Sequence, residues 1–120
     1  MTGAEGEAIA AAFLLKQGYR ILERNYRTPL GEIDMIAKDG ETLVFIEVKA
    51  RSVVQFGAPQ SAVDLRKQAK MSRVALAYLS RKKIDSSDCR FDVIGVLKGP
   101  GGPQVELFQN AFDVTEFKGC

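Results

Sequence analysis

The chain contains no histidine among its 120 residues. This absence excludes Ser-His-Asp triads, Cys-His pairs, zinc sites with imidazole ligands and nucleases that use a histidine base. Only two cysteines are present, Cys89 and Cys120, and neither has a partner at metal-binding spacing. Carboxylates and lysines are therefore the material that remains for catalysis.

The chain also lacks the signals of export and of membrane insertion. No apolar run approaches the length of a membrane span, and the first residues lack the basic, then apolar, pattern of a signal peptide. We interpret the two cysteines as free thiols in a reducing compartment, with a disulfide as the alternative. We therefore expect a cytoplasmic protein with no membrane partner.

Length and composition are those of one globular domain. The chain is 46% hydrophobic and 27% charged, which is ordinary for a protein with a single core. We expect residues 1–120 to form one α/β domain, a sandwich with a mixed central sheet covered by helices on both faces. Its expected elements, in the order α-β-β-β-α-β-β, are a helix at 5–17, a strand at 20–23, a hairpin over 32–50, a helix that ends at Lys83, and strands at 91–97 and 104–108.

A hairpin turn is predicted near the middle of the first half. Asp39-Gly40 separates two apolar runs, and this dipeptide is a strong signal for a two-residue turn. If these residues form the loop, Lys38 lies opposite Glu41.

Three charged residues meet on one face of this hairpin. In the predicted register Asp34 lies opposite Phe45, and Glu47 is one diagonal step further along. Since side chains alternate along a strand, Lys49 shares that face. Diagonal neighbours are roughly 7–8 Å apart, so two carboxylates can hold one cation between them.

A solvated polar face is the alternative interpretation, and the neighbouring residues argue against it. Glu32 is predicted to lie opposite Glu47, and like charges in that position destabilise a sheet. A hard divalent cation such as Mg²⁺ or Mn²⁺ resolves this conflict. The other face is apolar throughout, as in a central strand that is covered on both sides; it consists of Ile33, Met35, Val44, Ile46 and Val48.

A third acid is a candidate for the same site. Glu7, Ala10, Ala11 and Leu14 fall on one stripe of the first helix, so Glu7 points inward near the helix start. An acid in the first turn also stabilises its helix through the dipole, which is the structural interpretation. Glu5 is the less well aligned alternative.

Positive charge is concentrated in the range 51–83, where Asp64 is the sole acid, although the net charge of the whole chain is only +2. Arg66, Lys70 and Arg73 recur at one helical stripe and suit a polyanion, while a solvated helix face is the alternative. The neighbouring inward stripe is expected to comprise Leu65, Ala69, Ser72, Leu76 and Leu79. The candidate nucleic-acid contacts are Arg51, Arg66, Lys67, Lys70 and Arg73.

The order Asp34, then Glu47-x-Lys49 on the next strand, is similar to the PD-(D/E)XK nuclease superfamily, which includes restriction enzymes and archaeal Holliday-junction resolvases. The runs GEIDMIA at 31–37 and FIEVKAR at 45–51 resemble more closely the YraN-like family of small bacterial proteins. One departure is Ile33, which stands where the superfamily name has proline. Shorter similarities to the family are Gly6-Glu7, Gly18-Tyr19, Asn25-Tyr26-Arg27, Phe56-Gly57, and the ranges 90–93 and 110–113.

The resemblance implies a restriction-endonuclease-like fold and a metal-dependent active site. Asp34, Glu47 and the backbone carbonyl of Val48 would ligate Mg²⁺ or Mn²⁺. Lys49 would hold or help to deprotonate the attacking water. The resemblance also favours Glu7 as the third acid.

We therefore expect an endonuclease that hydrolyses phosphodiester bonds in DNA, with branched or repair intermediates as candidate substrates. The rival hypothesis is a nucleic-acid-binding or protein-interaction module that keeps the fold without catalysis. A third is a nuclease that acts only as a homodimer or with a protein partner, because one small domain covers little of a duplex.

Overall fold

The computed structural model describes residues 3–52, 63–84 and 88–112, and it describes only the backbone at 51 and 52. The motif Phe56-Gly57 lies outside these residues. The elements in chain order are α1 (Gly3–Lys16), β1 (Arg20–Thr28), β2 (Gly31–Asp39), β3 (Thr42–Ser52), α2 (Leu65–Lys82), β4 (Cys89–Gly99) and β5 (Gly102–Phe112).

The strands form one five-stranded sheet in the order β1-β2-β3-β4-β5. All neighbours are antiparallel except β3 and β4, which are parallel. A parallel pair needs a crossover, and α2 lies in that connection. The predicted α/β architecture and its element order are confirmed, although most strands extend further than the sequence pattern indicated.

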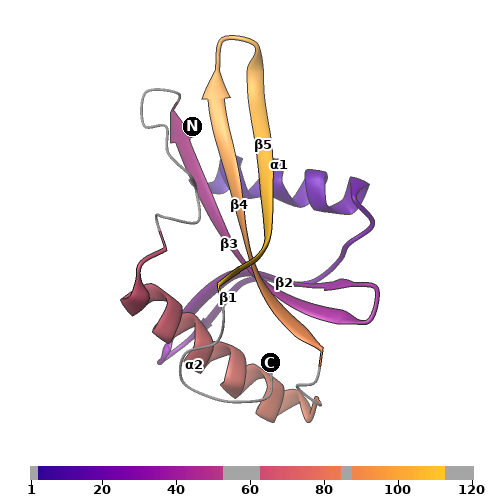
Figure 1. Ribbon diagram of the computed structural model, residues 1–120, viewed down its shortest axis with the longest axis vertical. Helices are drawn as coiled ribbons and strands as arrows, with labels where there is room; N and C mark the ends of the chain where they lie inside the picture. Colours follow the sequence, from indigo (N-terminus) through magenta and orange to yellow (C-terminus); the bar gives the residue numbers. More distant parts are fainter. Residues whose placement is uncertain (1–2, 53–62, 85–87, 113–120) are drawn as a thin grey trace.

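The two helices cover opposite faces of the sheet (Figure 1). On the α2 face, Phe45 and Phe91 pack against Tyr78 and its helical neighbours. On the α1 face, Leu14 packs with strand residues such as Ile46. Both helices begin on the left-hand side of Figure 1, so their positive dipole ends lie on the same side of the molecule.

Local signals account for the helix ends. The N-cap of α2 is Asp64, whose carboxylate accepts the backbone N–H of Lys67 at 2.8 Å. Gly18 follows α1 with φ = 91°, a conformation that favours glycine after a helix.

The inward face of α2 differs from the predicted stripe. Leu65 and Leu76 are 75% and 45% exposed, so those two assignments are wrong. Ser72 and Leu79 are buried as expected. The helix is rotated toward its largest apolar side chains, because the buried face also contains Met71, Val74, Ala75 and Tyr78.

The register of the central hairpin is shifted from the prediction. Asp39 pairs with Thr42 and Lys38 with Leu43, so the turn is Gly40-Glu41 and the predicted pairing of Lys38 with Glu41 is wrong. Gly40 adopts φ = 61°, as such a turn requires. The observed register places Ile36 opposite Phe45 in the core. Since the shift is by two residues, the side chains of the paired residues stay on their predicted faces.

Strand alternation nevertheless breaks at Asp34. Ile33 packs on the α2 face together with Ile36, whereas Met35 packs on the α1 face. The prediction that Ile33 and Met35 share a face is therefore wrong. On β1, Asn25 stands between the partners of these two residues and has φ = 52°. Both strands are thus irregular where Asp34 lies.

Two further expectations concern the cysteines and the membrane. Cys89 is disulfide-bonded, which contradicts its interpretation as a free thiol. Cys120 lies outside the described residues. No helix in the described ranges is both long and apolar enough to cross a membrane.

Candidate functional site

Asp34 lies at the point where β2 and β3 separate. The antiparallel backbone pairing of β2 with β3 runs from the turn to Met35 and Ile46. Beyond it, the Asp34 carboxylate accepts the backbone N–H of Val48 at 2.8 Å. The side chain of Asp34 thereby takes the place of a backbone partner, which fixes its carboxylate beside the next residues of β3.

Glu47 is the buried member of the site, with 3% of its surface exposed. Its Oε2 atom lies 3.3 Å from Nζ of Lys49 and 3.4 Å from Nζ of Lys67. Its other oxygen, Oε1, is buried and has no hydrogen-bond partner among the described residues. A buried acceptor without a partner costs free energy, so Glu47 has capacity for one more donor or cation.

The environment of Asp34 disfavours its charged form. Burial is the largest cause that raises its pKa, to about 7, and the negative charge of Glu47 is the next. The N–H of Val48 acts in the opposite direction, while a hydrogen bond between the carboxyl groups of Asp34 and Glu47 raises the pKa further, and the charge of Glu7 raises it least. Near neutral pH the metal-free Asp34 therefore exchanges a proton readily, and a bound cation would replace that proton. We refer to Asp34 and Glu47 as the acidic pair.

Glu7 approaches the acidic pair without completing a three-acid cluster. It is half-buried and lies, as predicted, on the α1 stripe that includes buried Ala10, Ala11 and Leu14. Its negative charge contributes to the raised pKa of Asp34. No group of three or more Asp, Glu, Cys or His side chains in the described residues is arranged to hold one metal ion.

Glu32 is not opposite Glu47. It pairs with Arg27 at 3.1 Å, and its side chain is 50% exposed. The two-residue register shift moves Glu32 away from Glu47, so the predicted contact between these acids is wrong. The acid that lies beside Glu47 is Asp34, whose pKa is raised by burial and by the charge of Glu47.

The predicted basic residues divide into two groups. Lys67 lies at the acidic pair, while Arg66, Lys70 and Arg73 form an exposed stripe along α2. Lys70 packs over the start of β2, because its Cβ lies 3.9 Å from the position that a Cβ on Gly31 would occupy. The side chain of Arg51 is not among the described ones.

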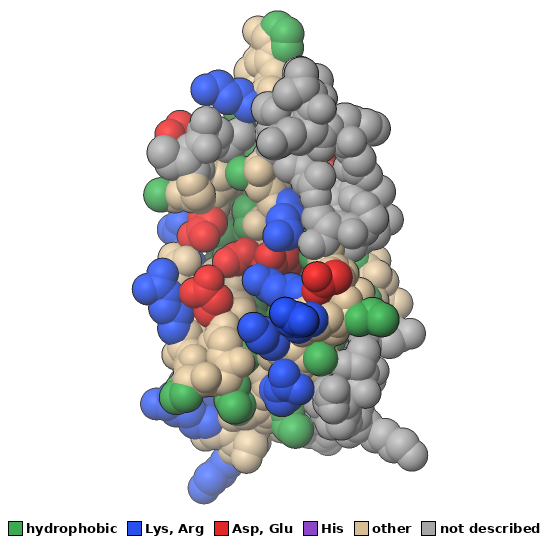
Figure 2. Space-filling view, turned by 90° about the vertical axis from the view of Figure 1, so that its left-hand side faces the viewer, with side chains coloured by type: hydrophobic (Ala, Val, Ile, Leu, Met, Phe, Trp, Pro, Cys, Tyr) green, Lys and Arg blue, Asp and Glu red, His purple; other side chains and the backbone are tan. Residues whose placement is uncertain are grey.

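Figure 2 shows the side of the molecule on which both helices begin. Acidic and basic side chains gather near the middle of this face.

The sequence analysis assigned Lys67 to the phosphate contacts and missed its ion pair with Glu47. The signal was present, because Lys67 precedes Met71, Val74 and Tyr78 at the spacing of the inward face.

A second polar cluster was not predicted. Both oxygens of Asp92, which is fully buried, are saturated: Oδ1 accepts from Arg90 Nε and the Asn110 N–H, and Oδ2 from Arg90 Nη2 and the Tyr19 hydroxyl. Arg90 also binds Asp39 at 3.0 Å. We call Tyr19, Asp39, Arg90 and Asp92 the arginine cluster. Its hydrogen bonds to Asp92 raise the pKa of Arg90 above its usual value.

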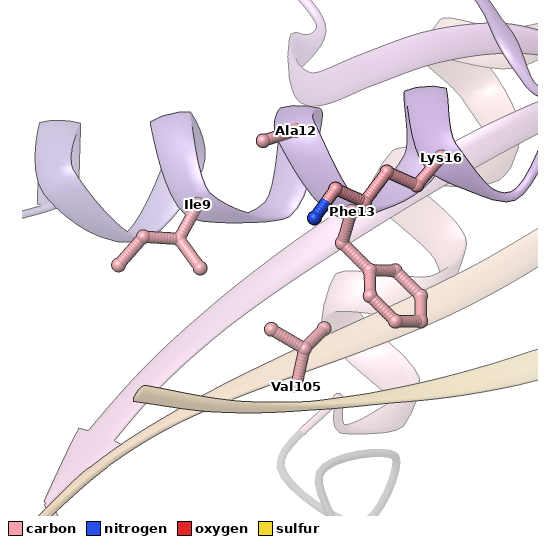
Figure 3. Close-up of a pocket in the computed structure, with 5 residues that line it drawn as sticks. All are labelled: Ile9, Ala12, Phe13, Lys16 and Val105. Atoms are coloured by element: carbon pink, nitrogen blue, oxygen red, sulfur yellow. The ribbon is translucent and has the colours of Figure 1, made fainter. Parts of the chain in front are cut away.

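Two surface hollows lie apart from the predicted site residues. An apolar pocket of about 280 Å³ is formed between α1 and β5 by Ile9, Ala12, Phe13, Lys16 and Val105 (Figure 3). A polar pocket of about 420 Å³ lies beside the β2–β3 turn. Neither is lined by a member of the acidic pair.

The fold and the acidic pair together define a small α/β protein with a charged site at the point where β2 and β3 separate. The model of the family described as "Uncharacterised protein family UPF0102" matches residues 6–96. The chain belongs to this family, which is the YraN-like family of the resemblance.

Relatives in other bacteria match nearly the whole chain. A UPF0102 protein of Syntrophus aciditrophicus is 50% identical over 95% of this chain and 90% of its own. The relative in Moorella thermoacetica is 55% identical over 78% of each chain. A UPF0102 protein of Geobacter sulfurreducens is 46% identical over 94% of this chain and 89% of its own.

Among solved structures, SfsA of Pyrococcus furiosus in complex with Ca²⁺ is similar with a TM-score of 0.36 and 15% identity. The match covers 86% of this chain and 60% of that one.

Proposed function

We propose that the protein is a metal-dependent nuclease of the PD-(D/E)XK type that hydrolyses phosphodiester bonds in DNA. The observation that carries this proposal is the acidic pair. One buried oxygen of Glu47 has no hydrogen-bond partner in the part of the chain that the structure describes, and the pKa of the adjacent Asp34 is raised to about 7. Structural carboxylates are normally satisfied, and perturbed ones cluster at functional sites.

The residues present fit a hard divalent cation. Asp34 and Glu47 offer carboxylate oxygens in one place, and the Val48 carbonyl is the additional protein ligand that the superfamily resemblance implies. Mg²⁺ and Mn²⁺ accept such oxygen ligands and retain waters, so two acids suffice without Glu7 as a direct ligand. When bound, the cation would polarise the scissile phosphate and lower the pKa of a bound water.

Lys49 supplies the third functional group of the motif. Its ammonium lies 3.3 Å from Glu47, and its side chain is 31% exposed, so it can meet both the metal ligand and a substrate. In the proposed reaction Lys49 orients the attacking water and stabilises negative charge that develops on the phosphate.

Positive potential beside the site supports a nucleic-acid substrate. The stripe of Arg66, Lys70 and Arg73 is exposed on α2, the helix whose Lys67 contacts Glu47. The N-terminal turns of both helices point to the same side of the molecule, where their dipoles favour an anion (Figure 1). A phosphate backbone therefore meets cations along α2 while one phosphate reaches the metal.

The test is a cleavage assay on linear, nicked and four-way-junction DNA with Mg²⁺ or Mn²⁺. Wild-type protein should cut at least one substrate, and Lys49→Ala should abolish cleavage while it leaves DNA affinity within about threefold. Calorimetry with Mn²⁺ should show a site that Asp34→Asn with Glu47→Gln removes. Circular dichroism controls for the fold.

Two outcomes would contradict the proposal. Unchanged Mn²⁺ binding in the double variant would show that the acidic pair is not the metal site. DNA binding without cleavage of any substrate would favour a non-catalytic binding module, and a protein that neither cuts nor binds DNA would favour a protein-interaction role.

A further inference from the structure

Lys67 occupies an unusual position for a residue on a basic helix. It lies in the first turn of α2, where its backbone N–H is fixed by the Asp64 cap. Its side chain turns to the sheet and places Nζ 3.4 Å from Glu47. The side chain is 36% exposed, so it borders the solvent while it contacts a carboxylate that is almost fully buried.

Two ammonium groups thus share one carboxylate oxygen. Lys49 and Lys67 both contact Oε2 of Glu47, while Oε1 has no hydrogen-bond partner within residues 3–50, 63–84 and 88–112. With both acids ionised, the four charges sum to −2 + 2 = 0. A divalent cation at the acidic pair changes the sum to +2. If the charge of Glu7 is included, the sum is +1.

This excess positive charge is unfavourable in a half-buried site unless an anion arrives. Lys49 is part of β3, the central strand, whereas Lys67 stands on the helix that carries the exposed stripe. Lys70 follows Lys67 by three residues on the helix surface, so the two side chains are neighbours. A Lys67 that leaves Glu47 therefore joins the stripe.

We propose that Lys67 is a positioning residue which neutralises Glu47 in the metal-free protein and turns to the substrate phosphate backbone when a divalent cation binds. Cation binding and substrate binding are thereby coupled through one side chain. This inference rests on the proposed function, because it takes the acidic pair as the cation site.

The first test is the Mn²⁺ affinity of Lys67→Gln measured by calorimetry. Removal of a cation beside the site should tighten Mn²⁺ binding by about tenfold, since like charges a few ångströms apart repel. Lys67→Arg retains the charge and should remain within about twofold of wild type. Lys82→Gln makes the same charge change at the far end of α2 and should also remain within about twofold.

The second test compares binding to a phosphorothioate duplex with and without Mn²⁺. Without metal, Lys67 is engaged by Glu47, so Lys67→Gln should weaken DNA binding by about twofold at most. With metal, the same change should weaken it by about tenfold, because a phosphate contact is then lost.

The outcomes separate this inference from the proposed function. If wild type binds no Mn²⁺, the proposed metal site fails, and this inference fails with it. If wild type binds Mn²⁺ but Lys67→Gln binds it equally or more weakly, only the role of Lys67 is overturned. An equal loss of DNA affinity with and without Mn²⁺ overturns the coupling.

Discussion

The acidic pair and the arginine cluster each contain a buried carboxylate on the same sheet, but the two carboxylates differ in the number of their hydrogen-bond partners. Asp92 has two donors on each oxygen, among them the guanidinium of Arg90. Oε2 of Glu47 contacts two lysines, while its other oxygen has no hydrogen-bond partner among the residues that the structure describes. Each cluster adjoins an edge strand with an asparagine at φ = 52°, Asn25 or Asn110.

The difference separates a carboxylate whose hydrogen-bonding capacity is used within the fold from one that, under the proposed function, would bind a cation. A saturated carboxylate has no free capacity, and the removal of either partner leaves a buried charge uncompensated. The acidic pair keeps unused capacity at a cost in stability, a property typical of active sites. Burial alone therefore does not distinguish the two carboxylates, whereas the number of their partners does.

The largest expected effect is the loss of the saturated carboxylate. Asp92→Ala should destabilise the protein by about 3–5 kcal/mol, because Arg90 then remains largely buried without its main partner. Urea unfolding monitored by circular dichroism measures this change. Asp88→Ala, at an exposed position, should stay within about 0.5 kcal/mol. A cost below about 1 kcal/mol for Asp92→Ala would remove the distinction between the two clusters.

The second effect concerns the cations beside the acidic pair. Replacement of Arg66, Lys70 and Arg73 by Gln should weaken duplex binding by about a hundredfold at about 0.1 M salt. Each lost phosphate contact should also reduce the log–log salt slope by about 0.9. All sequences should be affected alike, because phosphate contacts carry no base information.

The matched control for the stripe makes the same change in net charge at the other end of the molecule. Lys16, Arg20 and Lys38 replaced by Gln should leave duplex binding within about threefold. If both triple variants weaken binding equally, net charge rather than the stripe determines affinity. If the stripe variant binds with the affinity and slope of wild type, the stripe is a solvated helix face.

A third effect follows from the pKa of Asp34. The pKa of Asp34 in the folded protein is about 7, against 3.8 for an ordinary aspartate. Between these pH values the folded state therefore binds more protons than the unfolded state. Stability of the metal-free protein should therefore fall as pH rises from about 4 to about 7. Asp34→Asn removes this titration and should be more stable than wild type by about 1 kcal/mol at pH about 8.

Thermal unfolding without metal at a series of pH values checks this prediction. The difference between Asp34→Asn and wild type should grow with pH and level off above the folded pKa. Added Mn²⁺ should reduce the difference, because the cation stabilises the ionised acid of wild type. A difference that is independent of pH would contradict the raised pKa.

Much of the site could be predicted from the sequence, because strand alternation is a parity rule. The predicted hairpin register was shifted by two residues, yet Asp34, Glu47 and Lys49 still converge. An even shift leaves Glu47 and Lys49 on their predicted face. Asp34 lies where the alternation of β2 breaks, and its carboxylate reaches β3 by accepting the Val48 N–H. The position of Glu7 on the inward stripe of α1 was also predictable, because the period of a helix does not depend on long-range contacts.

The remaining features depend on contacts between distant segments. The turn position depends on core pairs such as Ile36 with Phe45, and Asp39 at the end of β2 is bound by Arg90. The break in alternation at Asp34 accompanies the left-handed Asn25 of the neighbouring strand. A local pattern on β2 alone contains neither fact.

The smallest expected effect compares the two asparagines. Both have φ = 52°. Residues with a Cβ adopt this left-handed conformation at a cost in free energy, which is smaller for asparagine than for most others. Asn25→Ala and Asn110→Ala should each destabilise the protein by about 1 kcal/mol, while Gly at either position should cost less.

The comparison becomes sharper in the function of the two variants. Asn110 contributes a backbone N–H to Asp92, so its replacement should affect stability without affecting Mn²⁺ affinity. Asn25 stands beside the point where Asp34 leaves the regular strand, so Asn25→Ala should also weaken Mn²⁺ binding by about threefold through displacement of that carboxylate. Urea unfolding and calorimetry on the same preparations separate the two effects. Equal Mn²⁺ affinities in both variants would show that the bend of β1 does not position the acidic pair.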